Sequence, residues 1–422
     1  SDPQPRVQNT NEVKYLTNNN DLFLYRAALI ELRERNFYIR NANREKDILS
    51  IVYAQSKYNS QPIVIGRIST VLDEISPNYI KKFELTNVNA GMPMHTVTVN
   101  RADFTSHQEE KLFPLAVKGI TVEPVTPNQT NYKYNPESSF PNIFWNLAPN
   151  LRTQLGGPDG FFFGDLSLSF NAETKFSPKF SLVTQANLGL ISNLDGLKLS
   201  SDSILPHVRT DIVLYLKESQ DFNLERIQLN YFHKLSTNIY TKISGGYLES
   251  MFAGVGGEIL YRPFGSDFGI GAEIWGVQQR DYDMLFGLRD YKTVTGHINL
   301  IYKEPKTQII FTMRGGKFLA KDSGINFDFS RRFPSGVRIG AFISRTDISK
   351  FEFGEGSFDK GFYFHIPVDI FFDKYTRGYT GFGLRPLTRD GAAFITHSHH
   401  LWGITEQAQS SNITRDWEDL YD

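Results

Sequence analysis

Residues 180–190, FSLVTQANLGL, decide the fold. The Phe and Leu side chains fall on one face of an extended chain and most polar ones on the other, because successive residues of a β-strand alternate between the faces of a sheet. The same alternation recurs in segments of about ten to fourteen residues from Trp145 to Trp402, which is typical of a membrane β-barrel. Since an open sheet edge is not tolerated in hydrocarbon, repeated alternation predicts a closed barrel.

Three further segments repeat the pattern with charged residues on the polar face. They are residues 207–217 (HVRTDIVLYLK), 325–332 (INFDFSRR) and 362–372 (FYFHIPVDIFF). A soluble β-sandwich would also alternate, with its polar face outside, so alternation alone does not say which face meets water. Sandwich strands are usually about five to six residues long, whereas membrane strands need about nine to eleven. Strand length therefore favours the transmembrane barrel.

The composition fits this fold class and excludes several others. Hydrophobic residues make up 40% of the chain and the mean hydropathy is −0.34, which excludes a helical membrane protein. Aromatic residues make up 14%, which suits the interfacial girdles of a barrel. The net charge of −1 argues against a nucleic-acid partner. With no cysteine in the sequence, disulfides, thiolate catalysis, Cys-ligated zinc and lipid attachment to this chain are excluded, and we expect no cofactor.

The first third of the chain has a different organisation. Residues 1–19 form a flexible leader rich in Asn, Pro and Gln, and because the chain starts at Ser1 without a signal peptide we interpret it as a processed or truncated product. Residues 20–112 repeat a helix–strand–strand order twice, with a helix capped at Asn20 or Asp21, which predicts a small α/β module. Residues 113–141 hold five prolines and form a linker.

Residues 142–402 form the predicted barrel, and residues 403–422 form a polar C-terminal tail. The candidate strands lie near residues 143–155, 161–174, 179–191, 207–218, 223–235, 238–248, 254–263, 267–278, 290–303, 307–317, 324–333, 336–346, 361–372, 377–387 and 392–402. That number is odd, and bacterial single-chain barrels normally have an even number of strands. The expected fold is therefore mainly β: a transmembrane antiparallel barrel of about 14 or 16 strands behind a small periplasmic α/β module.

Several motifs, in the same order, resemble the YjbH/GfcD family. They are residues 155–160 (LGGPDG), 205–211 (LPHVRTD), 246–258 (GYLESMFAGVGGE), 260–265 (LYRPFG), 289–291 (RDY), 295–297 (TGH), 354–361 (GEGSFDKG) and 386–391 (PLTRDG). The resemblance runs from about residue 45 to about residue 396. It implies an outer-membrane β-barrel associated with exopolysaccharide or capsule production, with residues 58–101 in a periplasmic module. Family members are usually much longer and carry a further N-terminal barrel, often with a lipoprotein-type start, so this chain resembles only their C-terminal part.

Charged residues at inward strand positions and beside a long connection are the candidate lining of the lumen. They are Arg209, Asp211, Glu258, Arg262, Arg280, Asp281, Arg289, Asp290, Asp328 and Arg385. An arginine facing lipid near the bilayer midplane would cost about 2–4 kcal/mol, so a lumenal position is strongly favoured. The lining would either exchange hydrogen bonds with a passing polymer or form a salt-bridge network that only stiffens the barrel.

Three histidines near the C-terminus, His397, His399 and His400, are candidates for a metal site. On a strand, His397 and His399 would share one face and His400 would lie on the other, so at most two ligands would converge. We therefore expect surface histidines and no metal. Glycosidase-type carboxylate pairs such as Asp159 with Asp165 exist, but the sequence contains no convincing nucleophile motif, so we expect no enzyme.

The expected function is a polar conduit for polysaccharide in the bacterial outer membrane, with the N-terminal module in the periplasm. The expected partners are the polysaccharide, outer-membrane lipid and other barrel or lipoprotein subunits of a secretion complex. Two alternatives stay open. The barrel could be closed and act as an assembly or anchoring platform for secretion partners, or it could be an outer-membrane enzyme that modifies a glycan or lipid.

Overall fold

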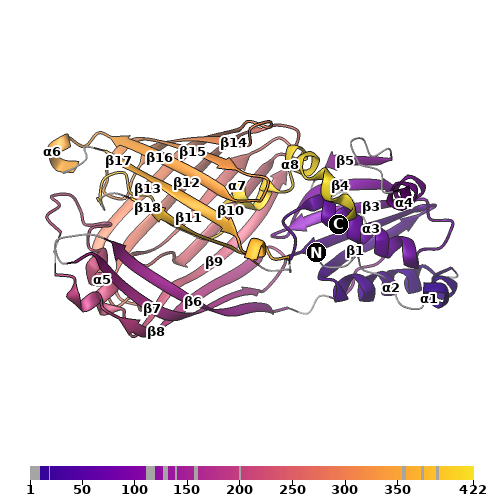
Figure 1. Cartoon of the computed structure of the whole chain (residues 1–422), viewed down its shortest axis with the longest axis horizontal. Helices are drawn as coiled ribbons and strands as arrows, with labels where there is room; N and C mark the ends of the chain where they lie inside the picture. Colours follow the sequence, from indigo (N-terminus) through magenta and orange to yellow (C-terminus); the bar gives the residue numbers. More distant parts are fainter. Residues whose placement is uncertain are drawn as a thin grey trace.

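The computed structural model has two parts, a five-stranded α/β module and a large curled β-sheet (Figure 1). The structure describes residues 10–18, 20–110, 119–126, 132–137, 140–155, 160–198, 201–353, 358–371, 375–385 and 389–422. Among these residues, no helix combines the length and the apolar composition needed to cross a bilayer.

The module follows the helix–strand–strand order expected from the sequence. Its elements are α1 (Thr10–Thr17), α2 (Asp21–Glu34), β1 (Phe37–Glu45), β2 (Ile48–Gln55), α3 (Gln61–Ile75), β3 (Lys82–Asn89), β4 (Met92–Asn100), α4 (Arg101–Glu110) and β5 (Ile120–Pro124). The strands pair in sequence order, and α3 makes the crossover between the parallel strands β2 and β3. The Asn20 side chain caps α2 by accepting a hydrogen bond from the Leu22 amide, as the sequence predicts.

The second sheet has thirteen strands within the described residues. They are β6 (Asn142–Leu155), β7 (Phe162–Lys175), β8 (Phe180–Ser192), β9 (Phe222–Ser236), β10 (Ile239–Tyr247), β11 (Phe252–Tyr261), β12 (Phe268–Arg280), β13 (Leu288–Lys303), β14 (Ile309–Lys317), β15 (Ser323–Arg332), β16 (Arg338–Thr346), β17 (Asp359–Pro367) and β18 (Tyr379–Leu384). Each strand pairs antiparallel with its neighbours in sequence. Figure 1 shows the sheet curling round on itself.

The expected closed barrel of 14 or 16 strands is not found. Among the described residues, the first strand, β6, and the last, β18, are not paired with each other. Two of the candidate strands are absent: residues 207–218 contain the helix α5 (Ile212–Glu218), and residues 392–400 are neither helix nor strand. The other candidates account for the thirteen observed strands. The mainly β, antiparallel fold class is confirmed, and the strand number is corrected.

The two faces of the curled sheet differ as the alternation predicts. Large apolar side chains on the convex face are exposed, with 66% of Ile243, 66% of Val255 and 63% of Ile274 accessible. Polar side chains on the concave face, such as Asn230 and Lys242, are buried. A soluble sandwich would bury its apolar face, so this sheet has the opposite arrangement, with an apolar outer surface around a polar interior.

The two ends of the sheet differ in the length of their connections. At the end nearest the module, the connections are short, as at residues 237–238, 262–267 and 304–308. At the far end lie the longer connections at residues 193–221 and 347–358. The first contains η1 (Leu194–Gly196) and α5, and the second contains α6 (Lys350–Phe353). Bacterial outer-membrane barrels have short periplasmic turns and longer external loops.

The C-terminal part of the chain is not the expected final strand and polar tail. Residues 389–400, here called the lumenal segment, run along the concave face of the curled sheet. They are followed by α7 (Leu401–Glu406), α8 (Ser410–Arg415) and η3 (Trp417–Tyr421), which lie between the sheet and the module in Figure 1. The 3-10 helix η3 packs on α3, where the Leu420 side chain is fully buried in the module core.

A second contact joins the module to the sheet through β4. His95 is completely buried beside Phe264, which follows β11, and the two rings lie 6.4 Å apart. Burial, together with the nearby Lys234 ammonium, lowers the pKa of His95 to about 3. His95 is therefore neutral at physiological pH and behaves as part of an apolar contact.

Candidate functional site

The lumenal segment begins at a network with the loop that precedes α5. Asp390 accepts hydrogen bonds from the backbone amides of Arg209 and Thr210 at 2.7 and 3.0 Å. The Arg209 guanidinium makes two bonds to the Glu249 carboxylate, at 2.8 and 3.1 Å, and a third to the Phe394 carbonyl oxygen. Paired, bidentate contacts of this kind are the strong class of charged hydrogen bonds.

The next residues are held from both sides. The amide of Ala392 donates to the Asp322 carboxylate at 2.7 Å, and the amide of Thr396 donates to Glu249 at 3.0 Å. Further along, the Ser398 amide donates to the Gln228 side chain at 3.0 Å. The segment thus satisfies its backbone through side chains of the sheet and its loops, which explains how an extended stretch without a partner strand can be buried.

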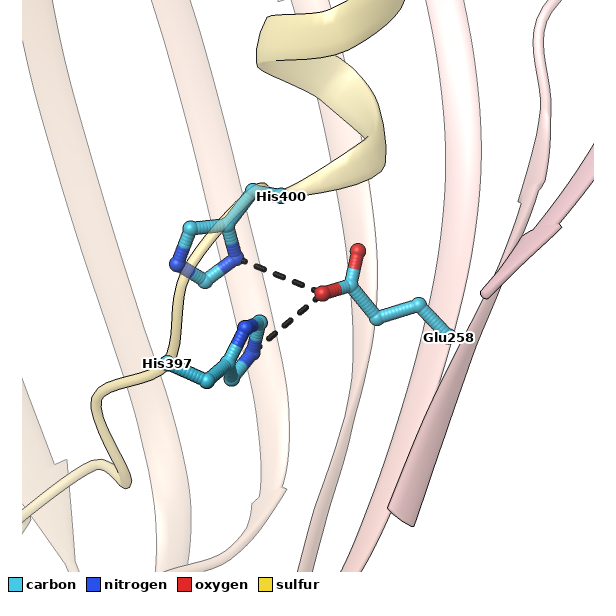
Figure 2. Close-up of side chains that lie close together, drawn as sticks. All are labelled: Glu258, His397 and His400. Atoms are coloured by element: carbon cyan, nitrogen blue, oxygen red, sulfur yellow. Dashed lines mark ion pairs between the residues drawn. The ribbon is translucent and has the colours of Figure 1, made fainter. Parts of the chain in front are cut away.

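A cluster of ionisable groups lies where the segment crosses β11 and β12. Oε1 of Glu258 is 3.2 Å from Nε2 of His397, 3.6 Å from Nδ1 of His400 and 2.8 Å from Nζ of Lys242 (Figure 2 shows the first two contacts). Nε2 of His397 also lies 3.2 Å from Oε2 of Glu273. Glu258 and Glu273 are direct cross-strand neighbours, so the pairing register brings the two carboxylates together.

The expected arrangement of the histidines is wrong. His397 and His400 face the same carboxylate, and His399 instead packs against Phe232 with a ring separation of 6.2 Å. The cause is the backbone of His399, which has a φ of 57°, in the left-handed region. That turn interrupts the alternation of an extended chain, so residues three apart come to share a face.

The segment is held again at the module end of the sheet. Arg262 is almost completely buried and donates to the Trp402 carbonyl oxygen at 3.1 Å and to the Thr405 hydroxyl at 2.9 Å, with its guanidinium 3.5 Å from the centre of the Trp402 ring. Arg338 pairs with Glu406 at 2.5 Å. Lys303 donates to Asn412 in α8. Cations of the sheet therefore bind the C-terminal part along its length.

Two of the cavities lined by described residues lie beside this segment and share no lining residue. One, of about 470 Å³, is lined by Arg152, Gln185, Arg209 and Glu225 near α5. The other, of about 500 Å³, opens toward the module and is lined by residues that include Lys175, Lys179, Glu173, His399 and His400. Both cavities have walls of mixed polar and apolar side chains.

The remaining predicted lining residues divide into buried and exposed groups. Arg280 is fully buried at the end of β12, and Arg289 lies 4.0 Å over the ring of Tyr282. Asp281 and Asp290 are exposed, and Asp290 lies on the convex-face positions of β13. Asp290 was wrongly expected in the lumen: it follows Arg289 directly on β13, and successive strand residues point to opposite faces of the sheet.

Three other predicted residues bind locally. Asp211 precedes α5 and accepts a hydrogen bond from the Tyr282 hydroxyl at 2.9 Å. Asp328 on β15 accepts one from the Tyr363 hydroxyl at 2.9 Å. Arg385 lies 3.4 Å from Asp359. The predicted set is therefore not one site: Arg209 and Glu258 contact the lumenal segment, Arg262 contacts α7 directly after it, and the others stabilise separate parts of the sheet and its loops.

Several residues of the site were missed by the sequence reasoning. Lys242 and Glu273 lie at strand positions that face the concave side of the sheet. The alternation of the sequence could have identified both as inward-facing residues. Glu249 and Asp390 lie in connections, where no periodic signal exists. Of the carboxylates weighed for catalysis, Asp165 is paired with Arg152 at 2.6 Å, and Asp159 lies outside the described residues.

Comparisons with known proteins agree with the motifs. A family model described as "YjbH: Exopolysaccharide biosynthesis protein YbjH" matches residues 2–407. The chain is 31% identical over 369 residues to the "Uncharacterized lipoprotein YjbH" of Escherichia coli (strain K12), a match that covers 85% of this chain and 52% of that protein. The chain therefore spans about half the length of the curated relative it matches.

A search of solved structures returned a porin, "Salmonella typhi OmpF complex with Daunomycin". The match covers 53% of this chain and 85% of the porin chain, with 12% sequence identity and a TM-score of 0.29. A score at this level does not support a shared fold.

Proposed function

The chain belongs to the YjbH family of exopolysaccharide biosynthesis proteins. From that premise we propose that it acts in exopolysaccharide production as an anchoring platform in the outer membrane, closed in the sense that its own lumenal segment fills the concave face of the sheet. Family membership supports a role in exopolysaccharide production. Neither the family nor the E. coli relative carries the name of an enzyme, and we propose a role without catalysis.

The outer-membrane placement rests on the convex face of the sheet. Exposed apolar residues continue around it from Trp145 on β6 through Ile274 and Ile298 to Phe382 on β18. A continuous exposed apolar surface of this extent marks contact with another apolar phase, which here would be lipid. The short turns lie at the module end, which favours a periplasmic position for the module.

The observation that carries the platform proposal is the lumenal segment. A conduit for a polymer needs a continuous hydrated path, but residues 389–400 occupy the concave face and bind Arg209, Gln228, Lys242 and Glu258. Each such hydrogen bond contributes about 0.5–1.5 kcal/mol net, and breaking them would leave buried charges without partners. The alternative of a closed platform is therefore better supported than the polar conduit.

The platform would present two surfaces to partners. The convex face would bind outer-membrane lipid, and the far-end connections and the module would bind other subunits of a secretion complex. The chain spans about half of its E. coli relative, so the remaining part of a longer family member is one source of such a partner. The polysaccharide would be handled by the assembled complex and not by the lumen of this sheet alone.

Conductance tests the proposal. The purified chain in planar lipid bilayers is expected to show no steady ion current, whereas a chain lacking residues 389–422 is expected to conduct because the concave face is then open. A chain lacking residues 416–422 is the matched control: it loses the contact of η3 with the module but keeps the lumenal segment, and it is expected to stay closed. Steady current through the full chain would contradict the platform and restore the conduit.

A further inference from the structure

The cluster at β11 and β12 has the chemistry of a metal site. Glu258 reaches inward from the sheet, and His397 and His400 reach toward it from the lumenal segment, so that both rings face the same carboxylate (Figure 2). Their ligand atoms all lie within 4.8 Å of one another. Imidazole nitrogens and carboxylate oxygens are the ligands that zinc-like ions take in proteins.

The separations match the edges of a coordination tetrahedron. With zinc-ligand bonds of about 2.0–2.1 Å, two ligand atoms at a tetrahedral angle lie about 3.4 Å apart. The observed Glu258–His397 and Glu258–His400 separations are 3.2 and 3.6 Å. An oxygen of Glu273 stands 3.2 Å from the same His397 nitrogen, beside this set of three ligands.

Basic nitrogens surround one ligand atom. The Glu258 side chain is nine-tenths buried, and its Oε1 lies 2.8 Å from the Lys242 ammonium and 3.2 and 3.6 Å from His397 and His400. A buried carboxylate is stabilised by positive charge close to it. The carboxylates of Glu258 and Glu273 carry two negative charges, and Lys242 supplies one positive charge. A bound cation would therefore balance the charge that Lys242 leaves uncompensated.

Lys242 does not block an ion at this position. Its ammonium also donates to the carbonyl oxygens of Ser398 and His399, at 2.9 and 3.2 Å, so it keeps partners when Glu258 binds a metal. Nδ1 of His397 lies 2.9 Å from the Lys242 ammonium and 3.3 Å from the Ser398 carbonyl oxygen. These two contacts fix the orientation of the ring, so that Nε2 faces the carboxylates.

The cluster is accessible. The His400 side chain is 57% exposed and lines the cavity of about 500 Å³ that opens toward the module. An ion can therefore reach the ligands without passing through the packed part of the interior.

We propose that Glu258, His397 and His400 form a binding site for one divalent cation of the zinc class, which cross-links the lumenal segment to β11. One ligand comes from the sheet and two from the segment, so the ion ties the segment in place. This inference stands whether the sheet acts as a platform or as a conduit, because it concerns only how the segment is bound.

Zinc binding to the full chain tests it. The purified protein in detergent micelles is treated with a chelator, dialysed and titrated with zinc sulfate, and we expect one bound ion per chain. His397→Gln and His400→Gln are each expected to weaken binding more than tenfold, because each removes one ligand. His399→Gln is the matched control, since its ring faces Phe232, and its affinity is expected to equal that of the wild type.

Cobalt gives a second readout that does not depend on folding of the variants. Cobalt(II) bound to the wild-type chain is expected to give the intense visible absorption of a tetrahedral ion, and zinc is expected to displace it. The inference is overturned by a wild-type chain that binds no zinc, by an octahedral cobalt spectrum, or by His400→Gln binding zinc as tightly as the wild type.

Discussion

Replacing Arg280 with Met is expected to lower the free energy of unfolding by about 3–5 kcal/mol. Arg280 is fully buried and donates to five backbone carbonyl oxygens of the described residues. They belong to Leu224 and Glu225 at the start of β9, and to Glu249, Met284 and Leu285 in two connections at the far end of the sheet. Methionine fills a similar volume but donates no hydrogen bond, so these carbonyls lose their donor while still buried.

Urea unfolding of the chain in detergent, followed by tryptophan fluorescence, measures this loss. Arg331→Met is the matched control, because Arg331 is an exposed arginine on β15 whose guanidinium stacks on Phe333, and its replacement is expected to change stability by less than about 0.5 kcal/mol. If both variants unfold at the same urea concentration, Arg280 does not hold the far-end connections together.

Replacing Gly66 with Ala is expected to release η3 from the module. Gly66 lies in α3, and a Cβ built there would stand 1.7 Å from the Leu420 carbonyl oxygen, so the backbone of one element has to move. Alanine would favour an isolated helix by about 1 kcal/mol over glycine. Exposing the buried Leu420 side chain costs about 1.5–3 kcal/mol and outweighs that gain.

Hydrogen exchange of residues 417–421 reports the release, and their protection is expected to fall about tenfold, the equivalent of about 1.4 kcal/mol. Gly403→Ala is the matched control, because a Cβ at Gly403 in α7 meets nothing within 4 Å. Unchanged protection in the Gly66→Ala chain would mean that η3 does not depend on this close approach for its position.

The strands and their orientation could be predicted from the alternation of apolar and polar residues. Such alternation indicates an extended backbone whose two faces lie in different environments. Phe180–Ser192 was found from its pattern and forms β8. Alternation does not report which strand is the neighbour. Residues 392–400 alternate and are extended, but their partners are side chains of distant strands, so the segment could not be distinguished from a strand.

The helix α5 shows a second limit of the pattern. Ile212, Leu214 and Leu216 alternate, which predicted a strand, but Ile212 and Leu216 are also four residues apart and share one face of a helix. In a segment this short, the two periods give overlapping patterns. The helix is stabilised by the burial of Leu216 against Phe163 and Leu194. This is a tertiary contact, which the local pattern of the sequence does not contain.

The site could be predicted only in part for a related reason. Glu258 and Arg262 were placed inward from their spacing on a strand; Glu258 contacts the lumenal segment and Arg262 contacts α7, which follows it. The pairing of His397 with His400 depends on the left-handed turn at His399, a residue type that adopts this conformation only occasionally. No pattern in the sequence marks that turn.

The central claim is that the chain's own lumenal segment occupies the concave face of the sheet, and a cysteine pair tests it most directly. The chain has no cysteine, so Asn230→Cys on β9 and Ser398→Cys in the segment introduce the only two thiols. The Asn230 side chain donates to the Ser398 hydroxyl at 3.3 Å, so mild oxidation of the membrane-embedded protein is expected to join the two cysteines.

Mass spectrometry of the digested protein identifies the linked peptides. In the control pair, Thr241→Cys replaces a residue on the convex face of β10, and no link to Ser398→Cys is expected. Formation of the 230–398 disulfide without the 241–398 disulfide is the result that the account predicts. Equal linkage in both pairs, or none in the first although both thiols react after unfolding, would contradict it.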